Sequence, residues 1–304
     1  MRQTLMAGAA TALVGRAALA ESKLPDICVF SKHLHWLDYN ASARFAADIG
    51  FNGLDLTVRP NGHVLPENAE RDIPAAAEAA RKADIRIMML TTEIDDAENK
   101  IQQTILKTAA ALRVPYYRMA WLKYDEQLSV EKNLQQFRRK LLALAELNEK
   151  LGIRGAYQNH AGANLGSPVW DIARLLNDIN SPWLGCQYDI RHAVVEGANA
   201  WPLGLKLAAP HINTLDIKDF QWAKINGKWQ VQNVALGEGM VDFKRFFKLL
   251  YQAGVKRETP ICLHFEYDLG GADKGAKSIT VAPEVVKNAM KRDLAALKSL
   301  LQSA

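Results

Sequence analysis

Residues 130–160 read VEKNLQQFRRKLLALAELNEKLGIRGAYQNH, and they contain one complete helix–strand unit. Apolar side chains recur there at three- and four-residue spacing, at Leu134, Phe137, Leu141 and Leu144. This period predicts an amphipathic helix over Val130–Leu151. The run Gly155–Gln158 follows at once, and its short length predicts a strand that ends on polar residues.

The same alternation continues along the chain from Asp26 onward. Eight short apolar runs predict strands: Ile27–Phe30, Gly53–Leu56, Ile85–Leu90, Tyr116–Ala120, Gly155–Gln158, Gly185–Tyr188, Ile212–Ile217 and Ile261–Phe265. The clearest amphipathic segments predict helices: Ala75–Ala83, Ala97–Leu112, Val130–Leu151, Val169–Asp178, Asp242–Ala253 and Ala282–Leu301. Strand–helix alternation repeated eight times predicts a parallel sheet, and eight parallel strands close most readily into a (β/α)8 TIM barrel.

A single α/β barrel domain over residues 24–304 fits the chain, because a barrel of eight units needs about 250 residues. The alternative is a doubly wound open sheet. That fold usually carries a Gly-rich turn after its first strand, and none is found here. The segment Gln221–Met240 is a long excursion in which Asn226-Gly227 predicts a small hairpin. We expect this segment to lie over the barrel mouth.

The N-terminus differs in kind from the rest of the chain. Arg2 precedes the Ala- and Leu-rich run Leu5–Gly15, and Ala18-Leu19-Ala20 gives a small-x-small cleavage pattern before Glu21. This order predicts a secretory signal peptide over residues 1–20 and therefore a periplasmic or secreted protein. An ordinary amphipathic first helix is the alternative. No other stretch approaches the roughly 20 apolar residues of a membrane span, so none is expected after signal removal.

The net charge of +5 is mild, and the Lys and Arg residues are scattered over the predicted helices rather than gathered in one block. We therefore expect no nucleic-acid partner. The three cysteines, Cys28, Cys186 and Cys262, each lie in a predicted strand, and no CxxC pair is present. Buried free thiols are expected in preference to disulfides or a thiolate metal site.

Polar, metal-competent side chains stand at the ends of four consecutive predicted strands. These ends read Tyr157-Gln158-Asn159-His160, then Gln187-Tyr188-Asp189 with Arg191 and His192, then Asp216-Ile217-Lys218-Asp219, and finally Leu263-His264-Phe265-Glu266. The active site of such a barrel lies at the carboxyl ends of its strands. We expect these side chains to gather there.

Alternation along a strand decides which of these side chains point the same way. Three pairs share a direction: Gln158 with His160, Asp216 with Lys218, and His264 with Glu266. Carboxylates brought together repel one another, and a divalent cation is the usual remedy. Oxygen ligands suit Mg²⁺ or Mn²⁺, while histidines would admit Zn²⁺ or Co²⁺, so the identity of the metal stays open.

With these motifs the chain resembles the sugar phosphate isomerase/epimerase superfamily, the xylose isomerase-like barrels that also include the AP endonuclease family 2 enzymes such as endonuclease IV. The similarity covers essentially Asp26–Leu301. It rests on five features: Gly50-Phe51-Asn52-Gly53-Leu54-Asp55, Asn159-His160, Asp189-x-x-His192, Ile217-Lys218-Asp219 and the Glu266 strand end. Family members typically hold a metal with Glu, Asp, His and Glu from strands five to eight. The resemblance therefore implies a divalent metal held by Gln158, Asp189, Asp216 and Glu266.

Two of these four positions depart from the family pattern. Gln158 replaces the first Glu and Asp216 replaces the His, so the formal ligand charge stays at minus three. Epimerases of this family resemble two-base enzymes in which the glutamates of strands five and eight each exchange a proton on one face. A glutamine cannot act as a base, so the two-glutamate mechanism is in doubt for this chain.

Other side chains are available for proton transfer and substrate binding. The candidate catalytic residues are Glu266, His160, Lys218 and His264. The two histidines can titrate near neutrality, and Lys218 can polarise a carbonyl or stabilise an enolate. The candidate substrate-binding residues, most of them from the earlier strands and loops, are Lys32, His63, Glu93, Arg118 and His192.

The expected function is a divalent-metal-dependent isomerase or epimerase that acts on a sugar or keto-sugar through an enediolate. The first alternative is a lyase or hydratase acting on 3-keto-glycosides or their unsaturated products, which the loss of one base favours. The second is a non-catalytic sugar-binding barrel. Endonuclease activity is disfavoured because the residues of a three-metal cluster cannot be assembled. The expected partner is a small, unphosphorylated carbohydrate, and a homodimer is left open because relatives often dimerise.

Overall fold

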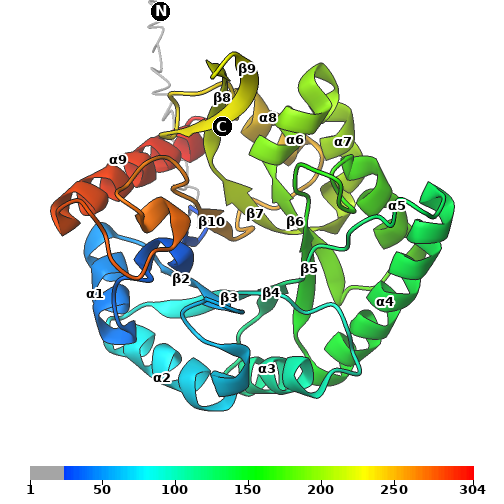
Figure 1. Ribbon diagram of the computed structural model, residues 1–304, viewed down its shortest axis with the longest axis horizontal. Helices are drawn as coiled ribbons and strands as arrows, with labels where there is room; N and C mark the ends of the chain where they lie inside the picture. The colour runs from blue at the N-terminus through cyan, green and yellow to red at the C-terminus, as the bar shows by residue number, and fades with distance from the viewer. Residues whose placement is uncertain (1–23) are drawn as a thin grey trace, which may run out of the picture.

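Eight parallel strands close into a barrel in the computed structural model, which describes residues 24–304 (Figure 1). Each strand pairs with its neighbours in the chain, and the last barrel strand closes against the first. In chain order they are β1 (Ile27–Phe30), β2 (Gly53–Val58), β3 (Arg86–Thr92), β4 (Tyr116–Arg118), β5 (Arg154–Gln158), β6 (Leu184–Asp189), β7 (Ile212–Ile217) and β10 (Ile261–Leu263). The predicted TIM barrel is confirmed. The predicted signal peptide, residues 1–20, lies outside the described residues.

Helices form a ring around the outside of the barrel (Figure 1). They are α1 (Tyr39–Ile49), α2 (Ala69–Lys82), α3 (Lys100–Ala111), α4 (Val130–Leu151), α5 (Val169–Ile179), α6 (Ile190–Gly197), α7 (Trp201–Ala208), α8 (Phe243–Gln252) and α9 (Pro283–Gln302). Across residues 24–304, none of these helices combines the length and the apolar character needed to cross a membrane.

The unit formed by α4 and β5 shows how the sequence builds the barrel wall. The hydroxyl of Ser129 caps the start of α4 by accepting from the Lys132 amide, and the helix ends at Gly152, which has a φ of 70°. Such caps satisfy backbone groups that a helix leaves open at its two ends. The bounds of α4 are those that the apolar period predicts, because both ends carry a residue suited to its cap.

A buried hydrogen bond holds α4 against the strands. The hydroxyl of Tyr117 in β4 donates to Asn148 Oδ1 at 3.0 Å, and the Asn148 amide donates to the carbonyl of Trp183 at 3.1 Å. Gly155 of β5 leaves room for this contact, because a Cβ there would meet Asn148 Nδ2 at 2.8 Å and the Tyr117 hydroxyl at 3.0 Å.

Helices α1, α6 and α7 are missing from the sequence prediction. The buried side of α1 is formed by Ser42, Ala43 and Ala46 beside Ile49. Strand ends also differ from the prediction. β4 ends at Arg118 and β10 at Leu263, each two residues before the predicted end.

The predicted hairpin is present and follows β7 directly. It consists of the antiparallel strands β8 (Asp219–Ile225) and β9 (Lys228–Val234), and its turn at Asn226 and Gly227 has positive φ values of 51° and 79°. In Figure 1 the hairpin (yellow) stands at the edge of the barrel beside α8. The three cysteines are buried and free, as predicted.

Candidate active site

Six polar side chains meet inside the barrel at the carboxyl ends of β5, β6, β7 and β10. We call them the central cluster: Gln158, Asp189, Asp216, Lys218, His264 and Glu266. All except Glu266 are at most 5% exposed. Because polar groups in such a place must satisfy one another, their hydrogen bonds and ion pairs define what the site can do.

The amide of Gln158 lies between two carboxylates. Its Nε2 donates to Asp189 Oδ2 at 3.1 Å and to Asp216 Oδ2 at 2.6 Å, while its Oε1 accepts from Arg118 Nη1 at 3.2 Å. A guanidinium can only donate, so the contact with Arg118 fixes which end of the amide carries the oxygen. Gln158 therefore presents hydrogen atoms to the carboxylates.

Both oxygens of Asp216 are occupied. Besides the contact with Gln158, Oδ1 accepts from Gln187 Nε2 at 2.7 Å and lies 3.4 Å from His264 Nε2. Burial opposes the charged form of Asp216, but His264 and these hydrogen bonds outweigh it and lower the pKa of the carboxyl. Asp216 is thus a carboxylate held in place on several sides.

The ammonium group of Lys218 occupies the middle of the cluster. Its Nζ lies 3.1 Å from Asp189 Oδ2 and 3.5 Å from Glu266 Oε2, and the side chain is 4% exposed. Burial alone would lower the pKa of Lys218, but Asp189 and Glu266 outweigh it and raise the pKa. Burial raises the pKa of Asp189 even though Lys218 opposes this shift. Lys218 is accordingly a buried cation.

Glu266 is the most accessible member of the cluster, with a side chain that is 21% exposed. Lys32 Nζ donates to its Oε1 at 3.1 Å, so the carboxylate lies between two lysines. Burial would raise the pKa of Glu266, but Lys218 and the other nearby cations hold it well below the usual value. Glu266 is therefore an ionised carboxylate at the open end of the cluster.

His264 lies between the two carboxylates of β7 and β10. Its Nδ1 is 3.8 Å from Glu266 Oε1, and its ring stacks on Phe30 with centroids 4.5 Å apart. Burial alone would lower the pKa of His264, but the Asp216 carboxylate outweighs it and raises the pKa above the usual value. The protonated imidazole can serve as a proton donor.

His160 stands beside the cluster between two aromatic rings. Its ring centroid is 4.2 Å from that of Trp121 and 3.8 Å from that of His192. Its Nδ1 is 2.8 Å from the carbonyl oxygen of Ala161, which can only accept, so Nδ1 carries the hydrogen and Nε2 the lone pair. Burial and the charge of Lys218 lower the pKa of His160 to about 4, which leaves a neutral ring at pH 7.

His192 has the opposite tautomer. Its Nδ1 accepts from the Ala161 amide at 3.1 Å and from Arg191 Nη1 at 2.9 Å, so the hydrogen is on Nε2, which lies 3.6 Å from Asp189 Oδ2. Burial and Lys218 lower its pKa well below the usual value. Arg191 also donates to Asn233 of β9 at 2.7 Å, which joins this side of the site to the hairpin.

The candidate substrate-binding residues do not all lie together. Lys32, Arg118 and His192 contact the central cluster. His63 forms a separate group, in which its Nε2 lies 3.1 Å from the Leu37 carbonyl and its ring packs on His35. Glu93 is exposed just after β3. His63 was predicted from the loop after β2 and Glu93 from the end of β3. The Glu93 carboxylate is near enough to Arg118 to oppose the lowering of the Arg118 pKa by burial.

Two polar residues of the barrel interior were not among the candidates. Gln187 donates to Asp216 and leaves its own buried Oε1 without a partner. Asp55 of β2 is fully buried and accepts from the Thr91 hydroxyl at 2.8 Å. Burial and the nearby Asp216 raise the pKa of Asp55 to about 6. A sequence signal existed for Gln187, because it lies two residues before Asp189 on the same face of β6.

Asp219, next to Lys218 in the chain, has a structural role. Its carboxylate accepts from the backbone amides of Phe220, Gly237, Gly239 and Val241. These bonds fix the chain that returns from the hairpin toward α8. Lys218 thus supplies a positive charge to the site, and Asp219 supplies a negative charge to the barrel wall beside it.

The donor set around the expected metal position does not fit a divalent cation as it stands. A metal ligand must turn a free oxygen toward the ion. Here Gln158 turns its NH₂ group inward, and the Asp189 and Glu266 oxygens face the ammonium group of Lys218. A cation could enter only if Lys218 moved away and the Gln158 amide turned over.

A different group of potential ligand atoms does lie close together. Asp55, Cys262 and His264 each offer one atom, and these atoms lie within 4.8 Å of one another, all buried. Burial and the neighbouring Cys28 thiol raise the pKa of Cys262 well above the usual value, so the thiol stays protonated. A thiolate, not a thiol, is the metal ligand, which speaks against an ion here.

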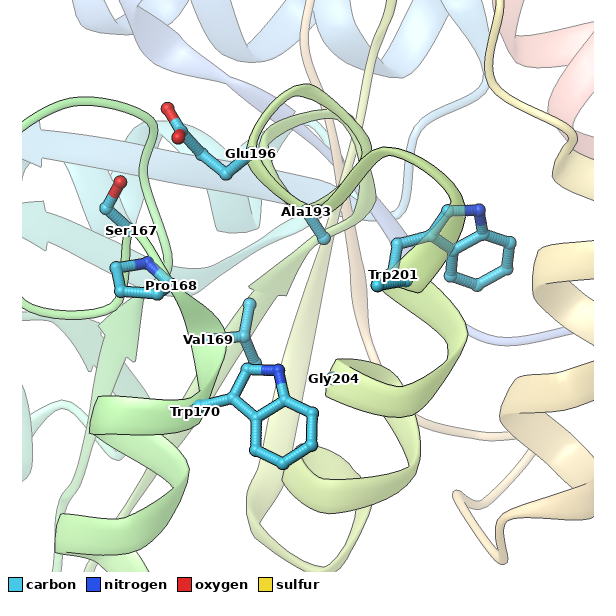
Figure 2. Close-up of a pocket in the computed structure, with 10 residues that line it drawn as sticks. Ser167, Pro168, Val169, Trp170, Ala193, Glu196, Trp201 and Gly204 are labelled. Carbon is cyan, nitrogen blue, oxygen red and sulfur yellow. The ribbon is translucent and has the colours of Figure 1, made fainter.

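A separate apolar pocket of about 250 Å³ opens on the outside of the barrel, between α5, α6 and α7. Figure 2 shows Val169 and Trp170 of α5 on one side of it and Ala193, Glu196 and Trp201 on the other. None of the central cluster lines this pocket. The chemistry of the barrel interior is therefore not carried by it.

Comparison with known proteins places this geometry in a family. The profile of the xylose isomerase-like TIM barrel family matches residues 43–283, and the chain belongs to that family. None of the curated proteins compared with the chain matches it.

Several solved structures share the fold. A 3-keto-D-glucoside 4-epimerase from E. coli is 13% identical, with a TM-score of 0.66 over 90% of this chain and 99% of that one. A probable 3-DHS dehydratase from Bacillus anthracis is 14% identical, with a TM-score of 0.66 over 90% and 98%. A xylose isomerase-like TIM barrel protein from Mycobacterium smegmatis, in complex with magnesium, is 12% identical, with a TM-score of 0.65 over 93% and 99%. At these identities the likeness shows the fold alone.

Proposed function

We propose that the protein is an enzyme that isomerises or epimerises a sugar or keto-sugar by moving a proton at the carbon next to a carbonyl group. The observation that carries the proposal is the placing of Glu266, an ionised carboxylate at the open end of a buried cluster, between Lys32 and Lys218. A base beside fixed cations is what formation of an enediolate needs, because negative charge moves onto the substrate oxygen as the proton leaves.

Each residue then has a distinct task. Glu266 accepts the proton from the substrate carbon. The ammonium groups of Lys218 and Lys32 bind the carbonyl and neighbouring hydroxyl oxygens and stabilise the charge that develops there. Arg118 and His192 border the same space and bind the remaining hydroxyl groups through their N–H donors.

The second proton transfer needs a group other than Gln158. His160 supports this role, because the Nε2 lone pair of its neutral ring can take up a proton from solvent and pass it to the enediolate. A Glu266–His160 pair would replace the two glutamates that the family resemblance implies. Return of the proton to the other face of the enediolate gives epimerisation, and its return to the neighbouring carbon gives isomerisation.

A lyase or dehydratase is the second candidate, and Gln158 favours it. Elimination needs one base for the carbon and one acid for the departing hydroxyl, not two bases. The protonated His264 beside Glu266 can supply the acid. A probable 3-DHS dehydratase among the solved structures with this fold supports the second candidate.

A divalent metal would polarise the substrate carbonyl in the metal-dependent form of this reaction. Asp189, Asp216 and Glu266 would hold it, and the magnesium complex of the relative from Mycobacterium smegmatis supports such an ion in the family. In this chain that form requires Lys218 and Gln158 to rearrange. The order of residues 1–20 supports a periplasmic or secreted protein, and hence an unphosphorylated carbohydrate as substrate.

The proposal is tested with hexoses, ketohexoses and 3-keto-glycosides in deuterated water, followed by NMR. We expect deuterium to enter at the carbon next to the carbonyl, and Glu266→Gln to slow this exchange at least about 100-fold. Glu98→Gln, at an exposed glutamate, is the matched control. Loss of water from the substrate would favour the lyase, and unchanged exchange in Glu266→Gln would exclude Glu266 as the base.

A further inference from the structure

We propose that Lys218 stands in the place of the divalent cation, so that the site is a metal-free one in which the protein's own ammonium group binds the substrate oxyanion. The catalytic half of this inference rests on the proposed function. The half that concerns cation binding does not, because it follows from the contacts within the central cluster alone.

The position of Lys218 Nζ carries the first part of the argument. It lies 3.1 Å from Asp189 Oδ2 and 3.5 Å from Glu266 Oε2, so it contacts two of the carboxylates that would hold a metal. The side chain is 4% exposed and comes from the end of β7, a rigid element of the barrel. An ion of charge +2 could not share this space with the ammonium group, because the two would repel one another.

Gln158 gives an independent second observation. Its NH₂ group satisfies Asp189 and Asp216, and its oxygen accepts from Arg118. If the amide turned over to offer its oxygen to a metal, its NH₂ group would meet the guanidinium of Arg118, and two donors would face each other in a buried place. Such an unsatisfied buried pair costs about 1–3 kcal/mol for each group. The amide is therefore held as a donor.

Charge balance points in the same direction. The cluster holds three carboxylates, from Asp189, Asp216 and Glu266, and the ammonium groups of Lys218 and Lys32 already offset two of them. The third, Asp216, lies 3.4 Å from His264 Nε2, and the Arg118 guanidinium is also buried nearby, so a divalent cation would leave the cluster with an excess of positive charge. Buried excess charge is strongly unfavourable. The charges of the cluster thus favour Lys218 over an added divalent cation.

The chemistry balances without a metal. The base removes a proton from the carbon next to the carbonyl, the electron pair of that C–H bond forms a C=C bond, and the carbonyl electrons move onto oxygen. The resulting oxyanion is stabilised by Nζ of Lys218. The proton returns to carbon in the last step, so no electrons are gained or lost and no further reactant is needed.

Cation binding is measured on the whole chain with Mn²⁺ and no substrate, by equilibrium dialysis and elemental analysis. We expect the wild-type protein to retain far less than one Mn²⁺ per chain. Lys218→Met removes the internal cation from three carboxylates, and we expect its Mn²⁺ affinity to exceed that of the wild type by about tenfold or more. Lys224→Met, at an exposed lysine of the hairpin, is the matched control and should bind like the wild type.

One Mn²⁺ held per wild-type chain would overturn the inference, and so would Lys218→Met binding no better than the wild type. If Lys218→Met does not fold, the wild-type measurement decides alone. Because no substrate is present, either result is independent of which reaction the enzyme catalyses.

Discussion

The side-chain amide of Gln158 donates to Asp216 Oδ2 at 2.6 Å, the closest contact that it makes in the central cluster. A glutamate at this position would place a carboxylate against a carboxylate. The contact thus depends on both the amide of Gln158 in β5 and the carboxylate of Asp216 in β7. Neither residue can be replaced by its family counterpart unless the other is replaced as well.

Gln158→Glu tests this dependence. The new carboxylate would lie against Asp189 and Asp216, and the repulsion would raise its pKa. A raised pKa favours the protonated form, so the variant is expected to lose stability as pH rises, by about 1–3 kcal/mol at pH 8 relative to pH 5. Urea denaturation at the two pH values measures this loss, with the exposed Gln232→Glu as control. Faster turnover in Gln158→Glu would show instead that Gln158 is a damaged base.

The raised pKa of Asp55 predicts that the free energy of unfolding depends on pH. Its pKa is raised to about 6 in the folded chain by burial and by Asp216, above the value near 3.9 of an unfolded chain. The folded state therefore binds more protons between these values, and stability contributed by Asp55 is lost as pH rises from about 4 to about 6, by roughly 2–3 kcal/mol.

Asp55→Asn should remove most of this loss, because the neutral amide keeps the Thr91 contact without the buried charge. Urea denaturation between pH 4 and pH 7 compares it with the wild type. Asp178→Asn, at an exposed position of α5, should retain the wild-type slope. Equal slopes for the wild type and Asp55→Asn would show that Asp55 does not titrate in this range.

Gly155→Ala should destabilise the barrel wall. The added methyl would lie 2.8 Å from Asn148 Nδ2 and 3.0 Å from the Tyr117 hydroxyl, so the buried hydrogen bond between them must move. Overpacking of this kind costs about 1–3 kcal/mol, which chemical denaturation measures. In Gly197→Ala the nearest atom is at 3.5 Å and φ is −96°, so this control should be close to neutral. An unchanged free energy of unfolding in Gly155→Ala would mean that α4 shifts freely to make room for the methyl group.

The sequence predicts the barrel because its strand–helix alternation is strong, as in Val130–Leu151 and the strand after it. It misses α6 and α7 because each has only 8 residues, about two turns, which is too short for a hydrophobic period to stand out. The gathering of polar residues at the ends of β5, β6, β7 and β10 also follows from the sequence, since parallel strands bring their carboxyl ends to one edge.

What the sequence does not contain is the direction in which each polar group points. A strand-end position does not show that Gln158 turns its NH₂ group inward, because Arg118 decides this from another strand. Nor does a strand-end position show where the flexible side chain of Lys218 places its ammonium group. The same gap explains His63, which follows β2 but contacts the Leu37 carbonyl and the His35 ring.

Proton exchange in the absence of metal tests the central claim most directly. Wild-type protein is dialysed against a chelator, freed of it, and incubated with the keto-sugar panel in metal-free deuterated water. If Lys218 serves as the internal cation for an enediolate, deuterium should enter the substrate at the same rate before and after dialysis, and added Mn²⁺ should not accelerate it. Exchange that stops after dialysis and returns with Mn²⁺ would contradict the account.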